Sequence, residues 1–359
     1  MRNIDFNYVV IRNGADFGKI WPAQNSSPSV KMNADGDIKT SLSGNFLSTV
    51  FDFEDKPTEE TVNWLSDMIR PEMVIDGAVY PLGVFIPVTV QIQEDVEGAG
   101  FTSLHIDAYD RCWQIKDIYT EQSQYFASGT NYIDAIVSLL TAAGIAIISA
   151  TETDAELAEA REDWNIGTSY LEIINQLLSE INYNPIWFNE TGAAVLEPAS
   201  VPTANNLDHM LDATDPENII LPGVVRETDI YSAPNVFICV CSNPDKSGAM
   251  IAKSENTNPQ SILSIPRRGR RIAKVFQVDN IADQDELQAY ADRLRNESMI
   301  TGENITVSTG LLPGYGVSDV VGIRYGDLFD ICVEKSWTMD LRVGGTMRHL
   351  LEKVVINLG

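Results

Sequence analysis

The sequence predicts an α+β fold, mainly β, in which two β-rich domains flank an α/β insert. Apolar and polar residues alternate in short segments over residues 1–119 and again over 206–359, as in strands with one buried face. Two apolar patterns with helical spacing lie between them, in residues 120–205. Because 359 residues suffice for two or three domains that each bury a core, these three ranges are the predicted domains.

A tight hairpin is the clearest element of the first domain. Met73–Ile75 and Val79–Pro81 flank Asp76-Gly77, a dipeptide suited to a type I′ turn, in which both central residues need positive φ. A strand over residues 84–93 then leads through a Gly-rich turn at 97–100 into another strand. Apolar residues alternate with polar ones in that strand and predict one buried face: Leu104, Ile106 and Ala108 against His105, Asp107 and Tyr109.

One helix is predicted to interrupt the strands of the first domain. Pro57 and Thr58 are suited to the start of a helix, and Pro71 would end it. Four apolar residues between them have helical spacing: Val62, Leu65, Met68 and Ile69.

The insert is predicted to contain two helices followed by a hairpin. The first helix ends near Gly144 and has one apolar face, formed by Tyr132, Ile133, Ile136, Leu139 and Leu140. Ser169 and Glu172 have the spacing of a capping box at the start of the second helix. Its buried stripe consists of Ile173, Ile174, Leu177, Leu178 and Ile181. Strands then flank a turn at Glu190–Gly192.

The last domain follows a linker at residues 201–218 and is again mainly β. Strands are predicted near residues 236–242 and 250–254. A helix is predicted from Asp283, which forms a second capping-box pattern with Glu286. Its apolar face contains Leu287, Tyr290, Ala291 and Leu294. Three strand-like segments complete the domain, at residues 303–309, 326–335 and 349–358.

The charge of the chain argues against nucleic-acid binding. Fifty-one acidic and 25 basic residues give a formal net charge of −26, whereas phosphate binding needs Lys and Arg concentrated on one face. No apolar run approaches the roughly 20 residues of a membrane helix, so neither a cleaved signal nor stable membrane insertion is expected. The four cysteines are too few and too irregular for a disulfide framework.

Residues that could carry catalysis or hold a metal are scattered. The three histidines, His105, His209 and His349, lie in different segments, so no catalytic histidine is expected. Cys239 and Cys241 lie on one face of a strand without a second pair of soft ligands, and buried packing is preferred to zinc. We therefore predict no enzyme activity, catalytic residue, metal or cofactor.

Two loops resemble ligand sites only superficially. Asn33, Asp35 and Asp37 could coordinate calcium, but the segment lacks the spaced oxygens and terminal Glu of an EF-hand, and a turn is preferred. Residues 310–316 are Gly-rich but lack the phosphate-loop Lys and the third glycine of a dinucleotide fingerprint, which indicates a long loop.

One basic cluster departs from the acidic background and supplies the candidate interface residues. The cluster surrounds Gly269 and contains Arg267, Arg268, Arg270, Arg271 and Lys274. Two interpretations stay open. It is either a solvated hairpin tip or a docking site for an acidic surface of a neighbouring subunit, because forked Arg donors bind carboxylates in a defined geometry.

Several short motifs, in this order, resemble the baseplate hub proteins of phage tails and phage-tail-like particles. In the first domain they are Ile69-Arg70-Pro71, Val74–Gly77, Tyr80–Phe85 and Ala108–Arg111. In the insert they are Leu171, Ile174-Asn175, Leu177-Leu178, Ile181, Tyr183, Phe188 and Gly192. The helix over 287–294 and the strands after it extend the resemblance over nearly the whole chain.

The resemblance implies two tail-tube-like β-barrel domains, at 1–119 and 206–359, with the α/β insert between them. Three subunits would form a pseudo-sixfold ring that joins a sixfold tube to a threefold spike or tip around a central channel. The implied partners are the tail tube or distal tail protein, the spike or tail-tip protein, other baseplate proteins and the tape measure protein. The implied location is the tail baseplate of a virion or tail-like particle assembled in the bacterial cytoplasm.

The acidic composition agrees with such a channel, because a negative wall repels DNA phosphates. Some related hubs carry a C-terminal peptidase or lysozyme module. No such module follows Gly359, so we expect any wall-degrading activity to belong to another protein.

Two other classes of protein stay open. A carbohydrate-active enzyme such as a glycoside hydrolase would need converging carboxylates, which so acidic a chain neither singles out nor excludes. A polysaccharide-binding tail adhesin would need an exposed aromatic shelf. Four tryptophans could form one, although their apolar surroundings favour core or subunit contacts: Trp64, Trp113, Trp187 and Trp337.

Overall fold

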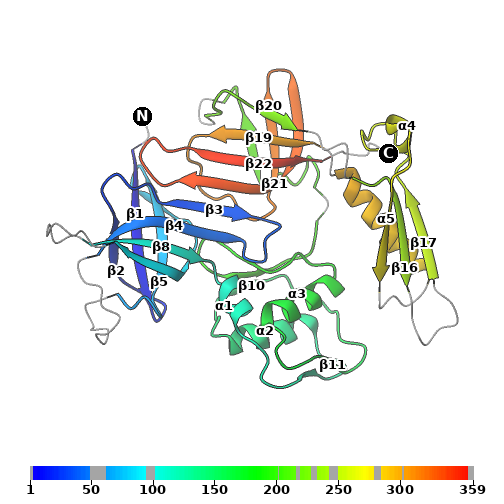
Figure 1. The fold of residues 1–359 in the computed structure, drawn as a ribbon, viewed down its shortest axis with the longest axis horizontal. Coiled ribbons are helices and arrows are strands. Elements are labelled where there is room, and N and C mark those ends of the chain that lie inside the picture. The colour runs from blue at the N-terminus through cyan, green and yellow to red at the C-terminus, as the bar shows by residue number, and fades with distance from the viewer. Residues whose placement is uncertain are drawn as a thin grey trace. The chain divides into compact units, whose positions relative to one another are not determined.

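The protein is mainly β with a smaller helical part, which confirms the predicted α+β, mainly β class, while the two β-barrel domains stay a prediction (Figure 1). The computed structural model describes residues 3–48, 62–93, 102–200, 202–215, 219–227, 233–241, 250–278, 284–300 and 303–354. The chain divides into two compact units. Unit 1 comprises residues 1–201, 310–317 and 336–348, and unit 2 comprises 202–309, 318–335 and 349–359. The division into domains at 119 and 205 stays a prediction.

The β-rich part of unit 1 is built from antiparallel ladders. Its strands are β1 (Ile4–Arg12), β2 (Ala15–Pro22), β3 (Ser29–Asn33), β4 (Thr40–Ser48), β5 (Met68–Ile75), β6 (Ala78–Pro81), β7 (Ile86–Gln93) and β8 (Thr102–Tyr109). β1 lies between β2 and β5, while β4 lies between β3 and β8. Ser336–Asp340, the last residues of β21 (Leu328–Asp340), pair with β3. The predicted alternation in β8 is confirmed, because Leu104, Ile106 and Ala108 are buried.

The hairpin between β5 and β6 has the predicted turn. Asp76 and Gly77 have φ values of 50° and 89°, as a type I′ turn requires. The Gly-rich turn predicted at 97–100 lies outside the described residues.

The helix predicted from residue 57 is wrong over residues 62–70, where the structure has a turn and the start of β5. Asp67 fixes the turn, because its buried carboxylate accepts from the Asn63 amide at 2.7 Å and pairs with Arg12 at 2.6 Å. β5 then pairs with β1 along its whole length, and Pro71 lies opposite Tyr8. The ladder to β1 therefore overrides a spacing that fits a helix equally well.

Residues 112–196 of unit 1 have a hydrophobic core of their own. Their elements are α1 (Cys112–Asp117), β9 (Gln124–Phe126), α2 (Tyr132–Ala142), β10 (Ile148–Ala150), β11 (Arg161–Trp164), α3 (Tyr170–Glu180), β12 (Trp187–Phe188) and β13 (Ala194–Leu196). Both predicted helices and the hairpin are confirmed. Ser169 caps α3 by accepting from the Glu172 amide at 3.2 Å. Leu139, Ile174 and Leu177 lie in the shared core.

Unit 2 contains strands of two separate sheets. Its remaining elements are β14 (His209–Asp212), β15 (Val225–Glu227), β16 (Val236–Cys241), β17 (Met250–Glu255), α4 (Ile265–Arg268), β18 (Ala273–Val278), α5 (Gln284–Ile300), β19 (Asn304–Thr309), β20 (Val320–Tyr325) and β22 (Met347–Lys353). β20 pairs with β14 and with β21, and β15 pairs with β19. The sheet β17-β16-β18 packs against α5 (Figure 1). The predicted strands and the helix are confirmed, while the cap at Asp283 lies outside the described residues.

Candidate interaction surface

The predicted basic cluster lies at a helical turn before β18, not at a hairpin tip. α4 is one turn long, and Ser264 caps it by accepting from the Arg267 amide at 3.4 Å. Gly269 ends the turn with φ 64°, a left-handed conformation that favours glycine. The cluster continues through Arg270 and Arg271 into the exposed strand β18, which carries Lys274.

Part of this positive charge is already used within the subunit. Glu255 binds Arg271, with Oε2 at 2.9 Å from Nη1, and binds Lys253 at 2.6 Å. These hydrogen bonds from Arg271 and Lys253 lower the pKa of Glu255 to about 2. Arg268 donates to the carbonyl of Ala233. The side chains of Arg267, Arg270, Arg271 and Lys274 are all exposed, so the cluster presents positive charge at the surface.

The cysteines of the sheet face its helix. Cys239 and Cys241 lie on one face of β16 and pack with Ala252 against Leu287 and Ala291 of α5. This arrangement confirms the packing role predicted for the pair. All four cysteines are buried and unbonded to one another. Over the ranges that the structure describes, no group of three or more His, Cys, Asp or Glu could hold a metal ion.

Two of the three histidines make simple surface contacts. His105 Nδ1 lies 2.7 Å from Asn45 Oδ1 on the exposed side of β8. His209 Nε2 lies 2.9 Å from Asp319 Oδ2. Neither contact includes a hydroxyl or thiol that a base could activate.

The third histidine belongs to a buried polar cluster. His349 Nδ1 lies 2.7 Å from Glu334 Oε2, and His349 Nε2 lies 3.1 Å from Thr309 Oγ1. A hydroxyl, an imidazole and a carboxyl in this order resemble a nucleophilic triad. All three residues are 0 % exposed, so no substrate reaches the hydroxyl. We therefore assign the cluster a structural role, not a catalytic one.

Burial keeps the histidine and the glutamate of this cluster uncharged. It raises the pKa of Glu334 well above its ordinary value, and nearby Asp319 acts in the same direction. It also lowers the pKa of His349 to about 3. Both shifts favour a protonated carboxyl that donates to a neutral imidazole. This pair could not be predicted from sequence periodicity, because 15 residues separate the two positions and only the pairing of strands brings them together.

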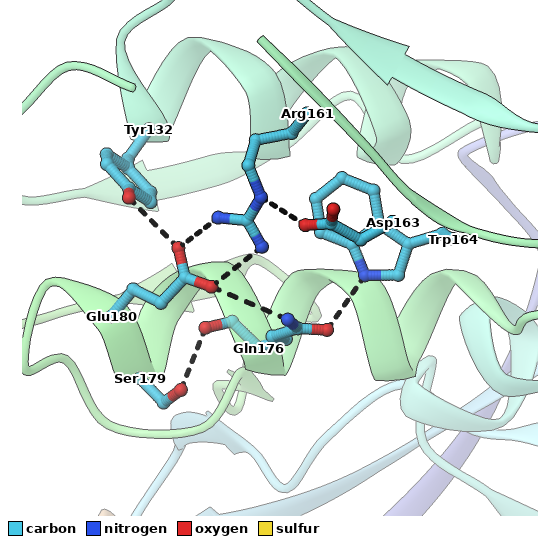
Figure 2. Close-up of polar contacts among 7 residues, drawn as sticks. All are labelled: Tyr132, Arg161, Asp163, Trp164, Gln176, Ser179 and Glu180. Carbon is cyan, nitrogen blue, oxygen red and sulfur yellow. Dashed lines mark hydrogen bonds and ion pairs between the residues drawn. The ribbon is translucent and has the colours of Figure 1, made fainter. Parts of the chain in front are cut away.

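A second polar network fastens β11 to the helices α2 and α3 (Figure 2). Arg161 binds Glu180 with Nη1 2.8 Å from Oε2 and also pairs with Asp163. Tyr132 donates to Glu180 at 2.9 Å. Burial, with help from this hydrogen bond, raises the pKa of Tyr132 to about 12. Arg161 is paired with both carboxylates, so we assign the network the structural role of linking β11 to the two helices.

A recess in unit 1 has an apolar and aromatic lining. It encloses about 470 Å³, open solvent included, and Leu82, Trp187, Tyr315 and Trp337 are among its lining residues. The loop predicted at 310–316 is confirmed and supplies Tyr315.

The four tryptophans do not form an exposed shelf. Trp64 and Trp337 are 8 % and 6 % exposed. Trp113 stacks on Tyr109 with ring centroids 5.5 Å apart, and Trp187 donates to Glu197 at 3.2 Å. These contacts support the interpretation that the tryptophans pack within the protein.

The segment that could have bound calcium is a turn. The Asp35 amide donates to Asn33 Oδ1 at 3.2 Å, as in an Asx turn. Asp37 pairs with Lys116 at 2.8 Å, and this contact lowers the pKa of its carboxyl. The Asn33 side chain and the Asp35 amide thus form the turn, and the Asp37 carboxylate forms an ion pair.

In the part of the chain that the structure describes, no helix is long and apolar enough to cross a membrane.

Comparison with known proteins identifies the class of fold. No protein-family model matches the sequence, and no curated protein matches it. The 43 kDa tail protein of prophage MuSo2 from Shewanella oneidensis has a TM-score of 0.67 at 10 % identity, over 97 % of this chain and 98 % of that protein. A tail protein from Neisseria meningitidis MC58 has a TM-score of 0.64 at 14 % identity, over 97 % and 96 % of the two chains.

A secretion-system protein shows the same likeness. The E. coli c3393 protein, a component of the type VI secretion system described as similar to the T4 tail proteins gp27 and gp5, has a TM-score of 0.50. Its identity to this chain is 8 %, over 99 % of this chain and 77 % of that protein. The chain therefore has the fold of phage tail proteins, and the predicted resemblance to proteins of phage tails is confirmed over nearly its whole length.

Proposed function

We propose that the chain is the baseplate hub of a phage tail or phage-tail-like particle. The observation that carries the proposal is the similarity over nearly the full length to tail proteins, with unit 1, the insert and unit 2 all included. The similarity to c3393 also supports a place in a tail or tail-like particle, because that protein is described as similar to the T4 tail proteins gp27 and gp5.

In this role the chain forms a homotrimer. Each subunit supplies two tube-like β-barrel domains, so three subunits make a pseudo-sixfold ring between a sixfold tube and a threefold spike or tip. The tail tube or distal tail protein, the other baseplate proteins and the tape measure protein are the further partners. The role is structural and requires no reaction.

We further propose that the central channel is lined mainly by Asp and Glu, while the basic cluster faces a protein neighbour. Electrostatic repulsion extends over roughly a Debye length, about 8 Å at physiological salt, so charge must lie on the channel wall to act on passing DNA. The net charge of −26 makes such a wall available. A structure of the ring with a basic channel would exclude this arrangement.

The purified protein is expected to have a native mass of three times 39.6 kDa. Native mass spectrometry and light scattering measure this directly. If the free subunit needs its partners in order to assemble, electron microscopy of the intact particle takes the place of these two measurements. A single copy or a twofold arrangement of this chain within the particle would contradict the hub assignment.

Replacing both Arg267 and Arg270 with Glu is expected to weaken assembly on the order of tenfold while leaving the fold intact, because exposed charges contribute little to stability but repel acidic neighbours. Arg267 and Arg270 are chosen for their exposure, and a change of Arg268 or Arg271 would also remove the hydrogen bonds that these side chains donate to Ala233 and Glu255. Thermal melting reports the fold, and native mass spectrometry at several salt concentrations reports assembly.

The matched control for this charge reversal is Lys31→Glu with Arg342→Glu, which makes the same change of charge at exposed positions of unit 1. Equal effects of the two double variants would show that net charge matters and the cluster does not. Normal assembly of the Arg267 and Arg270 variant would show that the cluster is a solvated turn.

A further inference from the structure

Strand β18 forms one edge of the sheet β17-β16-β18, and that edge is open. β18 pairs in parallel with β16, and no other strand of the described ranges lies beside it. Four of its six residues are exposed, and the other two are half-buried. An exposed edge of this length is a template for pairing with another strand.

The backbone groups that point outward from β18 follow from its pairing with β16. The carbonyl of Ile272 accepts from the Val236 amide at 3.1 Å, so it faces β16. Backbone groups of successive residues in a strand point to opposite sides. Ala273, Val275 and Gln277 therefore direct their N–H and C=O groups away from β16.

The opposite edge of the same sheet is covered. Gln284 Nε2 of α5 donates to the carbonyl of Ile251 at 3.0 Å, and Gln288 Nε2 donates to the carbonyl of Lys253 at 3.1 Å. These amides occupy carbonyls of β17 that a further strand would use. A strand can therefore be added to this sheet at β18 and not at β17.

The two faces of β18 differ in chemistry. Phe276 packs with Cys239 in the core beneath α5, and Lys274 lies on the same face, with its Nζ 5.0 Å from the centroid of the Phe276 ring. Ala273 and Val275 lie on the opposite face, and both are exposed. A strand added beside β18 would therefore meet a positive charge on one face and apolar side chains on the other.

The surroundings of this edge are basic. Residues 250–278 contain six basic residues and one acidic residue. The acidic residue, Glu255, binds Lys253 and Arg271. Arg270 and Arg271 lead into β18 and are exposed. Because like charges on neighbouring strands repel, two copies of β18 would not pair with each other, whereas an acidic strand would be attracted.

We propose that β18 binds an extended segment of a partner protein in which acidic and apolar residues alternate. The segment would add a fourth strand to the sheet, with its acidic side chains beside Lys274 and its apolar side chains beside Val275. Backbone hydrogen bonds supply the affinity, and the alternating side chains supply the specificity. The proposal rests on the proposed function only in that the basic cluster faces a protein neighbour, and it does not require the trimer.

A synthetic peptide is the probe for this edge. A fluorescent peptide in which Glu and Val alternate is expected to bind the purified protein, and fluorescence anisotropy measures its affinity. A peptide of the same composition, with all Glu before all Val, is expected to bind on the order of tenfold more weakly, because it cannot match both faces of β18 at once. Equal binding of the two peptides, or no binding of either, would overturn the proposal.

Val275→Pro tests the pairing at the backbone. Proline removes the outward N–H of residue 275 and is tolerated where that N–H faces solvent, whereas Val275→Thr keeps it. The proline variant is expected to bind the alternating peptide about tenfold more weakly than the threonine variant, the effect of one lost hydrogen bond. Equal affinities of the two variants would contradict strand addition at β18.

Lys274→Glu tests the charge and does not depend on the proline variant folding. The reversal is expected to weaken binding of the alternating peptide on the order of tenfold, because the new glutamate would lie beside acidic side chains of the peptide. Lys31→Glu is the matched control, because Lys31 is an exposed lysine on strand β3 of unit 1. Equal losses in both variants would show that net charge decides binding and would overturn the proposal.

A cross-linking experiment locates the peptide and tests for a competing occupant. Gln277→Cys on β18 places an exposed thiol in a protein whose four native cysteines are buried. A short bismaleimide is expected to link this thiol to a cysteine-bearing form of the alternating peptide, and Lys31→Cys is the control. Links that form chiefly between two Gln277→Cys subunits would assign the edge to a second copy of the chain and overturn the proposal.

Native mass spectrometry of the wild-type protein separates this proposal from the hub assignment. A trimer that binds no alternating peptide would overturn the proposal and leave the hub assignment standing. A protein that binds the peptide through β18 but forms no trimer, alone or in the particle, would overturn the hub assignment alone.

Discussion

Replacing Glu334 with alanine is expected to destabilise unit 2 by about 3 kcal/mol, and replacing it with glutamine by less than about 1 kcal/mol. Alanine leaves the buried Nδ1 of His349 without its partner at 2.7 Å and also leaves a cavity. Glutamine has nearly the shape of a protonated glutamate, and its amide can donate to the same nitrogen. Urea denaturation of the three proteins at pH 5.5 measures the difference.

This comparison distinguishes a neutral pair from a buried ion pair. If Glu334 were ionised beside an imidazolium, glutamine would leave an uncompensated buried charge and cost about 3–5 kcal/mol, as much as alanine. Similar losses for both variants would therefore refute the neutral pair. Glu162→Gln is the matched control, because Glu162 is an exposed carboxylate of unit 1.

Sequence periodicity predicted those elements whose contacts are local. The stripe on α3, the cap at Ser169 and the turn at Asp76-Gly77 each depend on residues within one or two turns of chain. The helix predicted over the segment after residue 62 was wrong, because β5 in this segment pairs with β1, which lies more than 50 residues earlier. The same pattern of apolar residues fits both structures, and only the distant partner decides between them.

The features of the candidate interaction surface also divide into those that the sequence predicts and those that depend on distant strand pairing. The basic cluster was visible from composition, because five cations within eight residues depart from an acidic background. The pairing of Arg271 with Glu255 and the protection of β17 by Gln284 and Gln288 depend on strand order, which the sequence does not reveal.

The protein is also expected to lose stability relative to its Glu334→Gln variant as the pH rises above about 4.5. The folded pKa of Glu334 lies well above its ordinary value of 4.5, so the carboxyl stays protonated in the folded state while the unfolded state releases its proton. The stabilising contribution of Glu334 is therefore complete below pH 4.5 and is lost as the pH rises. The slope reaches about 1.4 kcal/mol per pH unit, the value for one proton.

His349 acts in the opposite direction and shapes the profile of the pair. Its folded pKa of about 3 lies below the ordinary 6.5, so its contribution is complete above pH 6.5 and is lost as the pH falls. Between pH 4.5 and 6.5 the folded and unfolded pairs each hold one proton, and the two slopes cancel. The pair thus stabilises unit 2 most between pH 4.5 and 6.5. In the Glu334→Gln variant only His349 titrates, so that variant loses stability only as the pH falls below 6.5. Urea midpoints from pH 4 to 8 measure the difference between the two proteins, and a difference that does not change with pH would contradict the protonated state of Glu334.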